Sequence, residues 1–588
     1  MNKFFRFLFL LNKILLLTTK TIFTDNLQNA LSQVNPGDII ELSSGVYDKI
    51  PYKITKSGTQ DNPIIIRPQT QASIQFTGSN DACIFELNQV SYINIEGFME
   101  LSNSKCGIKI SDSNNIIIKE LHIHDIEQQA IIVSGENIEI RDNNIYNCGL
   151  ESKNIKQSLT YGDYQCVSSL AKNENNDFSK NIIVKNNSIE NGYGEGIKFS
   201  YCDNCIAISN NITNTFSMNI YLYSSKNLLI KGNIIKVTNK EYNSKFGKAV
   251  GIGLSTDNTN DIEELEIQNN VIIGCRIGIY FFITGKGSYR YVKIYHNTLW
   301  MIEITPIWFA EPINPPSNCE LFNNFIYHNK QYQLSPKKVW DIGYNIFYNT
   351  EKVPSQYEDS KSRQKTSQAI KKIDLSGIFN NINGDCDYTN ANINISCFRP
   401  NPSPQGKINI YHKGIKIKEK EKDLEGCDRD NIPSIGAFES PEGCKKEEPP
   451  ESDTSDTTEP EPTDPTDLPD IMYDVKFIID YNCNSPLSLK IATSLNNWNY
   501  FFSMNSEGEN KWVYTLKEAN NYEFNYKFIV FDNGSNIIQR WEARDYNRIF
   551  KGKNLAEFAN KYDDGYYEKC KYEKKGNLIT LTCSWNSF

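Results

Sequence analysis

Residues 180–233 read KNIIVKNNSIENGYGEGIKFSYCDNCIAISNNITNTFSMNIYLYSSKNLLIKGN, and this stretch nearly repeats itself. It holds three similar apolar segments at an interval of 23 residues, a period typical of repeats that stack into a solenoid. Apolar and polar side chains alternate within each segment, which is the periodicity of a β-strand rather than of a helix. The segments open at Asn181, Asn204 and Asn227 and close at Asn187, Asn210 and Asn233.

A strand that buries only one face must stack on its neighbours to complete a core. The repeat is too short to include a crossover helix, and a hairpin would not return the same residue at every turn of the chain. Asn suits a fixed corner because it tolerates left-handed dihedrals, and stacked Asn side chains can hydrogen-bond in a ladder. The sequence therefore predicts an all-β single-stranded solenoid, a right-handed parallel β-helix. A leucine-rich repeat is the alternative, but Leu is sparse and the LxxLxL pattern does not occur.

The chain has 588 residues, enough for more than one domain and a sizeable core. Its net charge of -9 gives no basic footprint, so we expect no nucleic-acid partner. Residues 1–23 place Lys3 and Arg6 before an apolar run, which is the order of a secretory signal peptide. An uncleaved membrane anchor is the alternative, although the run is short for a span, and no later segment reads as a membrane span. We therefore predict a secreted, extracellular protein.

The 15 cysteines fit an oxidising compartment and suggest disulfide bonds. Cys202 and Cys205 have the spacing of a redox or zinc pair. No second CxxC accompanies them, and the five His residues do not cluster in ligand spacing, so a disulfide at a coil corner, or buried thiols, is favoured and no metal site is predicted. Sequons that permit N-glycosylation stand at Asn186, Asn211, Asn394 and Asn533.

The ends of the predicted solenoid carry their own patterns. Residues 26–47 read NLQNALSQVNPGDIIELSSGVY, which predicts a short amphipathic helix and then a strand. A helix here would cap the open end of the stack. Together with residues 57–67, this stretch resembles the opening segment of secreted β-helix polysaccharide lyases, of the pectate-lyase-like superfamily. Residues 398–438 resemble the ending of many secreted β-helix proteins, so we expect the β-helix domain to cover residues 24–440, with regular coils from about residue 73.

Residues 441–470 are rich in Pro, Thr, Asp and Glu and hold almost nothing apolar, so we expect a disordered acidic linker. Alternating strands return at residues 471–588, with aromatic motifs whose order resembles carbohydrate-binding module family 20, the starch-binding domain. The resemblance implies an immunoglobulin-like β-sandwich that binds starch or a related α-glucan. The matching motifs are Leu495-Asn-Asn-Trp498, Trp512, Tyr526-Lys-Phe528, Trp541-Glu542 and Asn547-Arg548.

By this resemblance, the first glucan site of the module falls on Trp498 and Trp541, with Lys527, Glu542 and Asn547 as polar partners. Indole faces stack on the apolar faces of sugar rings, and polar neighbours hydrogen-bond the hydroxyls. The alternative is that both Trp side chains belong to the core, but the polar neighbours of Trp541 favour exposure. The strand that would carry the family's second site has no aromatic residue.

On the β-helix, strand alternation that turns Ile197 inward makes Lys198 point outward. The period of 23 sets Lys198 beside Tyr221, with Tyr223 on the same face. Glu195 precedes the strand at a Gly-flanked turn. Neighbouring coils are expected to add Lys109, Arg276 and Tyr280 to this face.

A cation beside a carboxylate and aromatic rings is what β-elimination from a uronate polymer requires. Lys198 would abstract the C5 proton, with Glu195 as the second catalytic candidate, while a cation or Ca²⁺ neutralises the uronate carboxylate. Glu195-Gly-Ile-Lys198 distantly resembles polysaccharide lyase family 6, but Tyr221 and Leu222 stand where that family has Arg and His. A solvated outer face is the alternative.

Two hypotheses for the β-helix remain open. One is a polysaccharide lyase acting on a second, acidic polysaccharide, and the other is a non-catalytic carbohydrate-binding or adhesion surface. The motifs of polygalacturonase-type hydrolases are absent, which leaves inverting hydrolysis unsupported. Starch is neutral whereas lyases cut uronates, so the first hypothesis requires a composite substrate.

Overall fold

The computed structural model describes most of the chain between residues 21 and 439, and the backbone of strands between Tyr473 and Ser584. The gaps in the first range are at 25, 71, 79–80, 155–163, 174, 239–248, 257–259, 284–285, 310–315, 329–339, 355–365 and short stretches within 371–440. Two compact units divide the chain near Glu448. Among the described residues, no helix is both long and apolar enough to cross a membrane.

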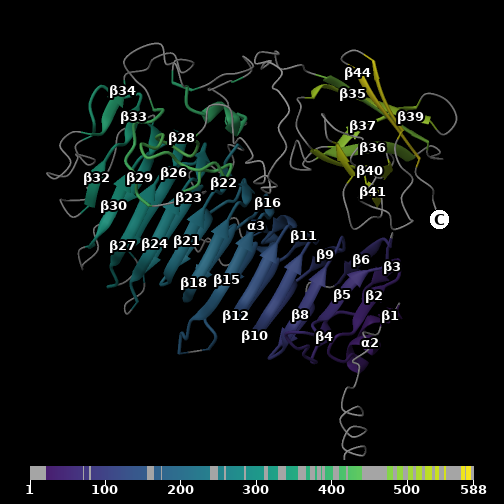
Figure 1. Ribbon diagram of the computed structural model, residues 1–588. Coiled ribbons are helices and arrows are strands. Elements are labelled where there is room, and N and C mark those ends of the chain that lie inside the picture. The colour runs from purple at the N-terminus through teal and green to yellow at the C-terminus, as the bar shows by residue number, and fades with distance from the viewer. Residues whose placement is uncertain are drawn as a thin grey trace, which may run out of the picture. The chain divides into compact units, whose positions relative to one another are not determined.

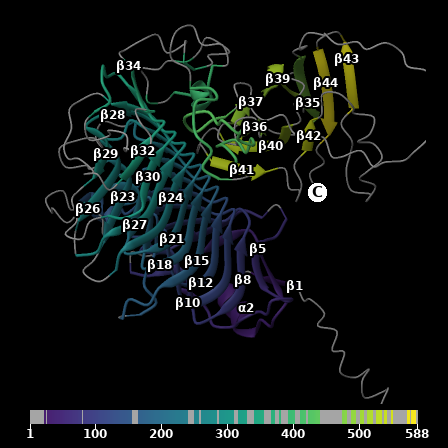
Figure 2. The same ribbon diagram turned by 60° about the vertical axis from the view of Figure 1, so that its left-hand side comes forward.

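The first unit is a right-handed stack of coils with three strand-bearing faces, and every pairing between coils is parallel (Figures 1 and 2). The first face consists of β4 (Tyr52–Ile54), β7 (Cys83–Asn88), β10 (Cys106–Lys119), β12 (Ile131–Arg141), β14 (Val167–Ser169), β17 (Ile197–Ser200), β20 (Met218–Tyr223), β23 (Val250–Thr256), β26 (Ile277–Ile283) and β29 (Thr305–Phe309). The second consists of β1 (Thr21–Thr24), β2 (Ile39–Leu42), β5 (Ile64–Pro68), β8 (Ser91–Glu96), then β10 and β12 again, β15 (Ser179–Lys185), β18 (Cys202–Ile208), β21 (Lys226–Lys231), β24 (Ile262–Gln268), β27 (Tyr289–Tyr295), β30 (Cys319–Phe322) and β32 (Trp340–Gly343).

The third face begins where each coil turns after the second. Because β10 and β12 run through both of the first two faces, these faces form one continuous sheet, whereas the third is separate. The third face consists of β3 (Gly45–Tyr47), β6 (Ile74–Thr77), β9 (Glu100–Ser104), β11 (His122–Ile126), β13 (Asn144–Cys148), β16 (Ser188–Glu190), β19 (Asn211–Thr213), β22 (Ile234–Lys236), β25 (Val271–Ile273), β28 (Thr298–Ile302), β31 (Phe325–His328), β33 (Ile346–Tyr348) and β34 (Gln368–Ile370).

The register between neighbouring coils places side chains of the same type opposite one another. On the first face one fully buried row runs along the interior, so each isoleucine packs on the one above and below it. These residues are Ile197, Ile220, Ile252, Ile279 and Ile307. The parallel β-helix predicted from the repeat is confirmed, and Ile197 opposite Ile220 confirms the 23-residue step.

Asn residues hold the corners in two different ways. Those that open the segments, such as Asn181 and Asn204, have a φ of 54° and 57°, and Asn204 Nδ2 donates to Asn181 Oδ1 at 2.6 Å on the surface. Those that close them are buried and form an internal ladder at 2.9–3.0 Å, in which each amide nitrogen donates to the next Asn Oδ1. The ladder runs through Asn143, Asn187, Asn210, Asn233, Asn270, Asn297, Asn324 and Asn345.

Helix α2 (Leu27–Gln33) lies at the N-terminal end of the stack, as predicted, and buries Leu27 and Leu31 (Figure 2). The stack begins earlier than the expected residue 73, because β1 already pairs with β2 and β2 with β5. Residues 1–20 of the predicted signal segment lie outside the described residues, and its last three residues belong to β1. The described residues also include the short helix α3 (Leu150–Asn154) and the 3-10 turn η4 (Ile395–Phe398).

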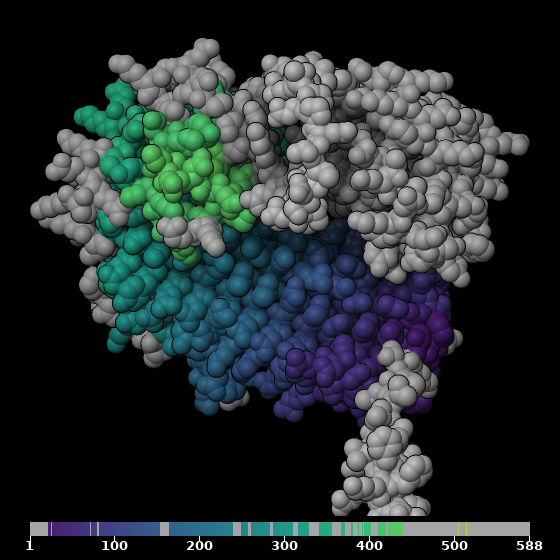
Figure 3. Space-filling view, viewed as in Figure 1, coloured from purple at the N-terminus to yellow at the C-terminus, as the bar shows by residue number. Residues whose placement is uncertain are grey.

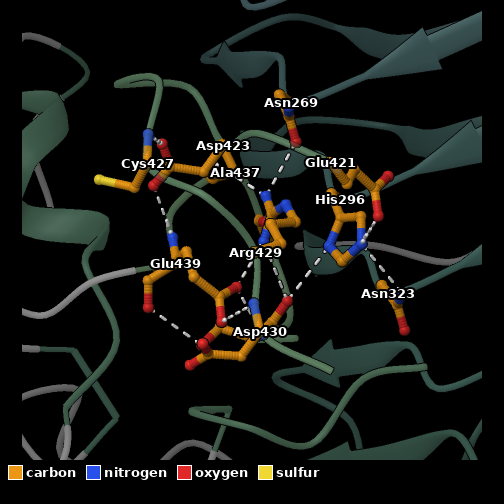
Figure 4. Close-up of polar contacts among 12 residues, drawn as sticks. Asn269, His296, Asn323, Glu421, Asp423, Cys427, Arg429, Asp430, Ala437 and Glu439 are labelled. Carbon is orange, nitrogen blue, oxygen red and sulfur yellow. Dashed lines mark hydrogen bonds and ion pairs between the residues drawn. The ribbon is translucent and has the colours of Figure 1, made fainter. Parts of the chain in front are cut away.

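Residues 410–418 and 421–439, here together called the strap, return across the stack and cover its corners (Figure 3). The strap is fixed by Arg429, which is buried, pairs with Glu439 at 2.9 Å and donates to Asn269 Oδ1 at 2.8 Å (Figure 4). His296 Nδ1 lies 3.1 Å from the carbonyl oxygen of Ser434. The strap therefore binds turns of successive coils through one buried polar network.

Disulfide bonds join neighbouring parts of the described stack. Cys202 and Cys205 are bonded to each other, as favoured from the sequence. The other described pairs are Cys83–Cys106, Cys148–Cys166 and Cys386–Cys397.

The second unit contains, among its described strands, two five-stranded sheets. β35 (Tyr473–Asp480) pairs antiparallel with β39 (Lys511–Ala519) and parallel with β44 (Leu578–Ser584). β36 (Leu487–Thr493) pairs antiparallel with β37 (Phe501–Ser503) and β40 (Phe524–Asp532). The predicted immunoglobulin-like sandwich remains a prediction, and the predicted linker at residues 441–470 lies outside the described residues. The other described strands are β38 (Asn505–Ser506), β41 (Ile537–Trp541), β42 (Arg548–Phe550) and β43 (Lys571–Lys575).

Candidate functional site

The outward positions of the first face form a row that runs along the stack. Lys198 lies opposite Tyr221, Tyr221 opposite Gly253, Gly253 opposite Tyr280, and Tyr280 opposite Trp308. Neighbouring strands lie about 4.8 Å apart, so this row spans roughly 19 Å from its cation to its indole.

Four aromatic side chains on this face pack against one another, and we call them the aromatic platform: Tyr221, Tyr280, Phe282 and Trp308. Ring centroids are 5.8 Å apart for Tyr221 and Phe282, 5.1 Å for Tyr280 and Phe282, and 5.0 Å for Tyr280 and Trp308. All four side chains are partly buried. They therefore offer a contiguous apolar surface with polar tips.

A small buried cluster supports the platform. Met218, Val250 and Ile277 lie beneath it, and each is less than a tenth exposed. Gly253 interrupts the aromatic row, and a Cβ added there would lie 2.1 Å from the Met218 sulfur. A larger residue at this position would therefore displace the Met218 side chain, which occupies the space beside Gly253.

Lys198 borders the platform, with its Nζ 5.3 Å from the centroid of the Tyr221 ring. Glu195 is only 4% exposed, and its Oε2 accepts a hydrogen bond from Gln165 Nε2 at 2.9 Å. Burial, with a smaller contribution from the Glu195 charge, raises the pKa of Tyr221 well above its usual range. Tyr221 is therefore a protonated phenol at neutral pH.

The remaining residues predicted for this face are less closely gathered. Tyr223 lies one outward position beyond Tyr221 and contacts Tyr201 edge-on at 5.5 Å. Arg276 is half-buried, and its backbone N–H donates to the Ala249 carbonyl at 3.0 Å. Lys109 is three register steps from Lys198, so the structure does not bring these two cations together.

The structure adds Phe282 and Trp308, which the sequence analysis did not select. The available signal was strand alternation, because Phe282 is two residues after Tyr280 and so shares its face. Trp308 precedes the buried Phe309 in β29 and follows the buried Ile307, which also marks it as outward.

The residues predicted to bind starch cannot be placed in the same way. Trp498, Glu542 and Asn547 lie outside the described residues. Lys527 lies in β40 and Trp541 ends β41, and for both only the backbone is described.

Among the described residues, two groups bring metal-ligating atoms together, and both belong to the strap. Asp423 stands with Glu425 and Cys427, but its Oδ1 accepts the backbone N–H of both neighbours, and Cys427 is disulfide-bonded. The other group is His412 with Asp430, 2.6 Å apart, and Glu439, which already pairs with Arg429. Neither group includes Glu195 or Lys198, so the Ca²⁺ considered for a lyase has no ready ligand set there within the described part of the chain.

Comparison with known proteins supports the architecture of the first unit. A family model of chondroitinase B matches residues 22–99, and a model of the right-handed β-helix region matches residues 171–299. We found no match among curated proteins.

Several solved structures are similar to this chain. An alginate lyase from Paenibacillus sp. str. FPU-7 has 18% identity and a TM-score of 0.41, with 50% of this chain and 98% of that chain covered. Pectate lyase Pel9A has 14% identity and a TM-score of 0.41, with 72% and 97% covered. PfbA, a surface adhesin of Streptococcus pneumoniae, has 14% identity and a TM-score of 0.39, with 58% and 83% covered.

Proposed function

We propose that the protein is a secreted polysaccharide-binding protein whose β-helix holds a sugar chain along the first face, on the aromatic platform. The C-terminal unit then acts as a starch-binding-type module that keeps the protein on an α-glucan. Joining two binding sites in one chain makes the second binding event intramolecular and raises overall affinity without any new contact.

The aromatic platform is the observation that carries this proposal. Four aromatic rings, each in contact with the next, form a partly exposed apolar surface over a buried base, and tyrosine hydroxyls and Lys198 border them. A pyranose has the matching character, because its ring faces are apolar and its rim carries hydroxyls. Ligand sites of this kind combine apolar walls with a few placed polar groups. A span of roughly 19 Å accommodates a segment of several sugar units rather than a monosaccharide.

A second candidate is β-elimination on a uronate-containing chain, and the Lys198–Tyr221 pair favours it. Lys198 would take the C5 proton while the C4–O bond breaks, and Tyr221 would give its proton to the departing oxygen. Burial keeps Tyr221 protonated at neutral pH, so its phenol has a proton to give.

The test is a panel of insoluble and soluble polysaccharides, neutral and acidic, with the full chain. Retention is measured by pull-down and affinity electrophoresis, and elimination by the ultraviolet absorbance of unsaturated uronate products. Trp308→Ala and Tyr280→Ala are the platform variants. Tyr291→Ala is the matched control, because Tyr291 is 46% exposed and lies in β27 on the second face.

We expect each platform variant to weaken retention at least tenfold on the polymer that the β-helix binds, and the control variant to bind as the parent protein does. Equal retention by all three variants would remove the platform from the site. Product absorbance that disappears in Lys198→Ala establishes the lyase, and cleavage that persists unchanged in Lys198→Ala rules out this base.

Starch retention is tested separately. Trp498→Ala combined with Trp541→Ala should abolish retention on starch while retention through the platform persists. Starch binding that survives the double substitution would contradict the assignment of the module's site.

A further inference from the structure

Two histidines lie side by side on the third face, whereas the aromatic platform lies on the first face. His122 and His124 occupy outward positions of β11, and the intervening Ile123 is fully buried. Their ring centroids are 5.1 Å apart. The five histidines do not cluster in the sequence at a spacing typical of metal ligands. However, a His-x-His pair on one strand places both imidazoles on the same face.

His124 is held between two carboxylates. Its Nδ1 lies 2.8 Å from Asp125 Oδ2, and its Nε2 lies 3.1 Å from Glu100 Oε1. The Tyr146 ring stacks on the imidazole, with an interplanar angle of 2° and centroids 4.6 Å apart. These contacts fix both the plane of the ring and the direction of Nε2.

The carboxylates on either side are themselves positioned. Gln75 Nε2 donates to Glu100 Oε1 at 3.1 Å, and Asn147 Nδ2 donates to Asp125 Oδ1 at 2.9 Å. Glu100 lies directly opposite His122 in the pairing of β9 with β11. The donor atoms of Glu100, His122 and His124 therefore come from two adjacent coils of one rigid sheet.

His122 supplies an uncommitted imidazole. In the part of the chain that the structure describes, its ring nitrogens make no hydrogen bond, and the aromatic rings beside it are Phe98, His124 and Tyr146. An imidazole nitrogen without a hydrogen-bond partner can donate its lone pair to a metal ion.

We infer that Glu100, His122 and His124 form a binding site for a divalent transition-metal ion of the Zn²⁺ class. Ligands about 2.0–2.1 Å from a tetrahedral zinc ion lie roughly 3.3 Å from each other, close to the present separation of His124 Nε2 and Glu100 Oε1. Zinc would replace the proton between these atoms. Asp125 on Nδ1 is the outer partner that a metal-bound histidine ordinarily has.

The third ligand requires a side-chain rotation. Among the described residues, His122 is not part of a group whose donor atoms already lie within 4.8 Å of one another. Its ring must turn towards Glu100, while the backbone of β11 stays in place. The site does not depend on the proposed function of the first face.

Calorimetric titration of the full chain with Zn²⁺ alone at pH 7.5 tests this inference, and the visible spectrum with Co²⁺ reports tetrahedral coordination. We expect 1:1 binding that weakens at least tenfold in His122→Asn, His124→Asn and Glu100→Gln. Asp125→Asn should weaken it by about 10- to 100-fold, as loss of an outer partner does. Binding should also weaken as the pH falls, because protons compete for His124.

His412→Asn is the matched control, since His412 belongs to the other histidine-containing group, in the strap. It should leave Zn²⁺ affinity unchanged. Loss of binding in His412→Asn with retention in His122→Asn and His124→Asn would move the ion to the strap and overturn the inference. Absence of binding by the parent protein at 1 mM Zn²⁺ would overturn it as well. Thermal unfolding of each metal-free variant identifies any that fail to fold. If a histidine variant fails to fold, Glu100→Gln, the smallest change, tests the site in its place.

Discussion

Replacement of Asn210 by Ala tests the internal ladder directly. The Asn210 side chain makes four buried hydrogen bonds. Its Oδ1 accepts from the backbone N and the Nδ2 of Asn187, both at 3.0 Å, and its Nδ2 donates to the Val184 carbonyl and to Asn233 Oδ1, both at 2.9 Å. Alanine removes all four bonds to partners in the two flanking coils, in a site that water does not reach. Asn187 Nδ2 still donates to the Ile140 carbonyl, and Asn233 Oδ1 still accepts from the Asn210 backbone N–H.

The size of the effect follows from these contacts. A buried polar group left unsatisfied costs about 1–3 kcal/mol, and the net value of an ordinary hydrogen bond is about 0.5–1.5 kcal/mol. Four bonds therefore predict a loss of about 4 kcal/mol. Unfolding entropy near 2.1 cal/mol/K per residue, over a unit of roughly 440 residues, gives about 0.9 kcal/mol/K. The expected fall in Tm is about 4–5 °C.

Differential scanning calorimetry of the full chain measures this shift, and Asn204→Ala is the matched control. Asn204 belongs to the exposed row of Asn residues, where one amide hydrogen bond and a φ of 57° are at stake. We expect the control to lower Tm by about 1 °C, since such a site is worth about 1 kcal/mol. If Asn210→Ala costs no more than Asn204→Ala, the buried ladder does not hold the coils in register, and the reasoning fails.

Three further predictions concern the platform, the strap and acid stability. Gly253→Ala should displace Met218 and weaken polysaccharide retention, because the new Cβ would lie 2.1 Å from the sulfur; pull-down measures this, and unchanged retention would contradict the packing described. Arg429→Met should destabilise the first unit by about 3–5 kcal/mol, because it leaves the Glu439 charge buried without its partner; calorimetry measures this, and a neutral effect would contradict the role of the strap. Burial, together with the Arg429 charge, lowers the pKa of His296 to about 4, so the unfolded chain binds more protons between about pH 6.5 and 4, and stability falls as the pH drops through this range. His296→Gln should flatten that part of the profile of Tm against pH, and a slope equal to that of the parent would contradict the assignment.

Much of the fold follows from the repeat because one physical requirement is imposed again at every coil. Strand alternation and the spacing of 23 predict that Ile197 lies above Ile220, and the structure has this pairing. The two roles of Asn were harder to separate, since the same side chain serves a left-handed corner at Asn204 and the internal ladder at Asn210. Coils before residue 73 lack the Asn corners, so the pairing of β2 with β5 left no comparable pattern.

The register between outward residues of neighbouring coils was predictable only where the period of 23 holds. Lys198 and Tyr221 are 23 residues apart, so their contact could be anticipated. The later steps of the row differ because loops of different length separate the coils. They are 32 residues from Tyr221 to Gly253, 27 from Gly253 to Tyr280 and 28 from Tyr280 to Trp308. The period of 23 residues therefore does not predict that Trp308 lies in this row.

The sequence pattern also did not predict the burial of Glu195. Glu195 was expected as a catalytic candidate at a turn, but its carboxylate is almost fully enclosed and bound by Gln165 from the preceding coil. Periodicity assigns a residue to a face and does not reveal which neighbours will cover it.

The strict stacking of the first face makes the coil a modular unit of length. Inserting or deleting one whole repeat would extend or shorten the row of outward residues by one strand spacing, about 4.8 Å, and leave the interior rows matched. Gene duplication within such an array can therefore change how long a polymer segment is contacted without inventing a new core.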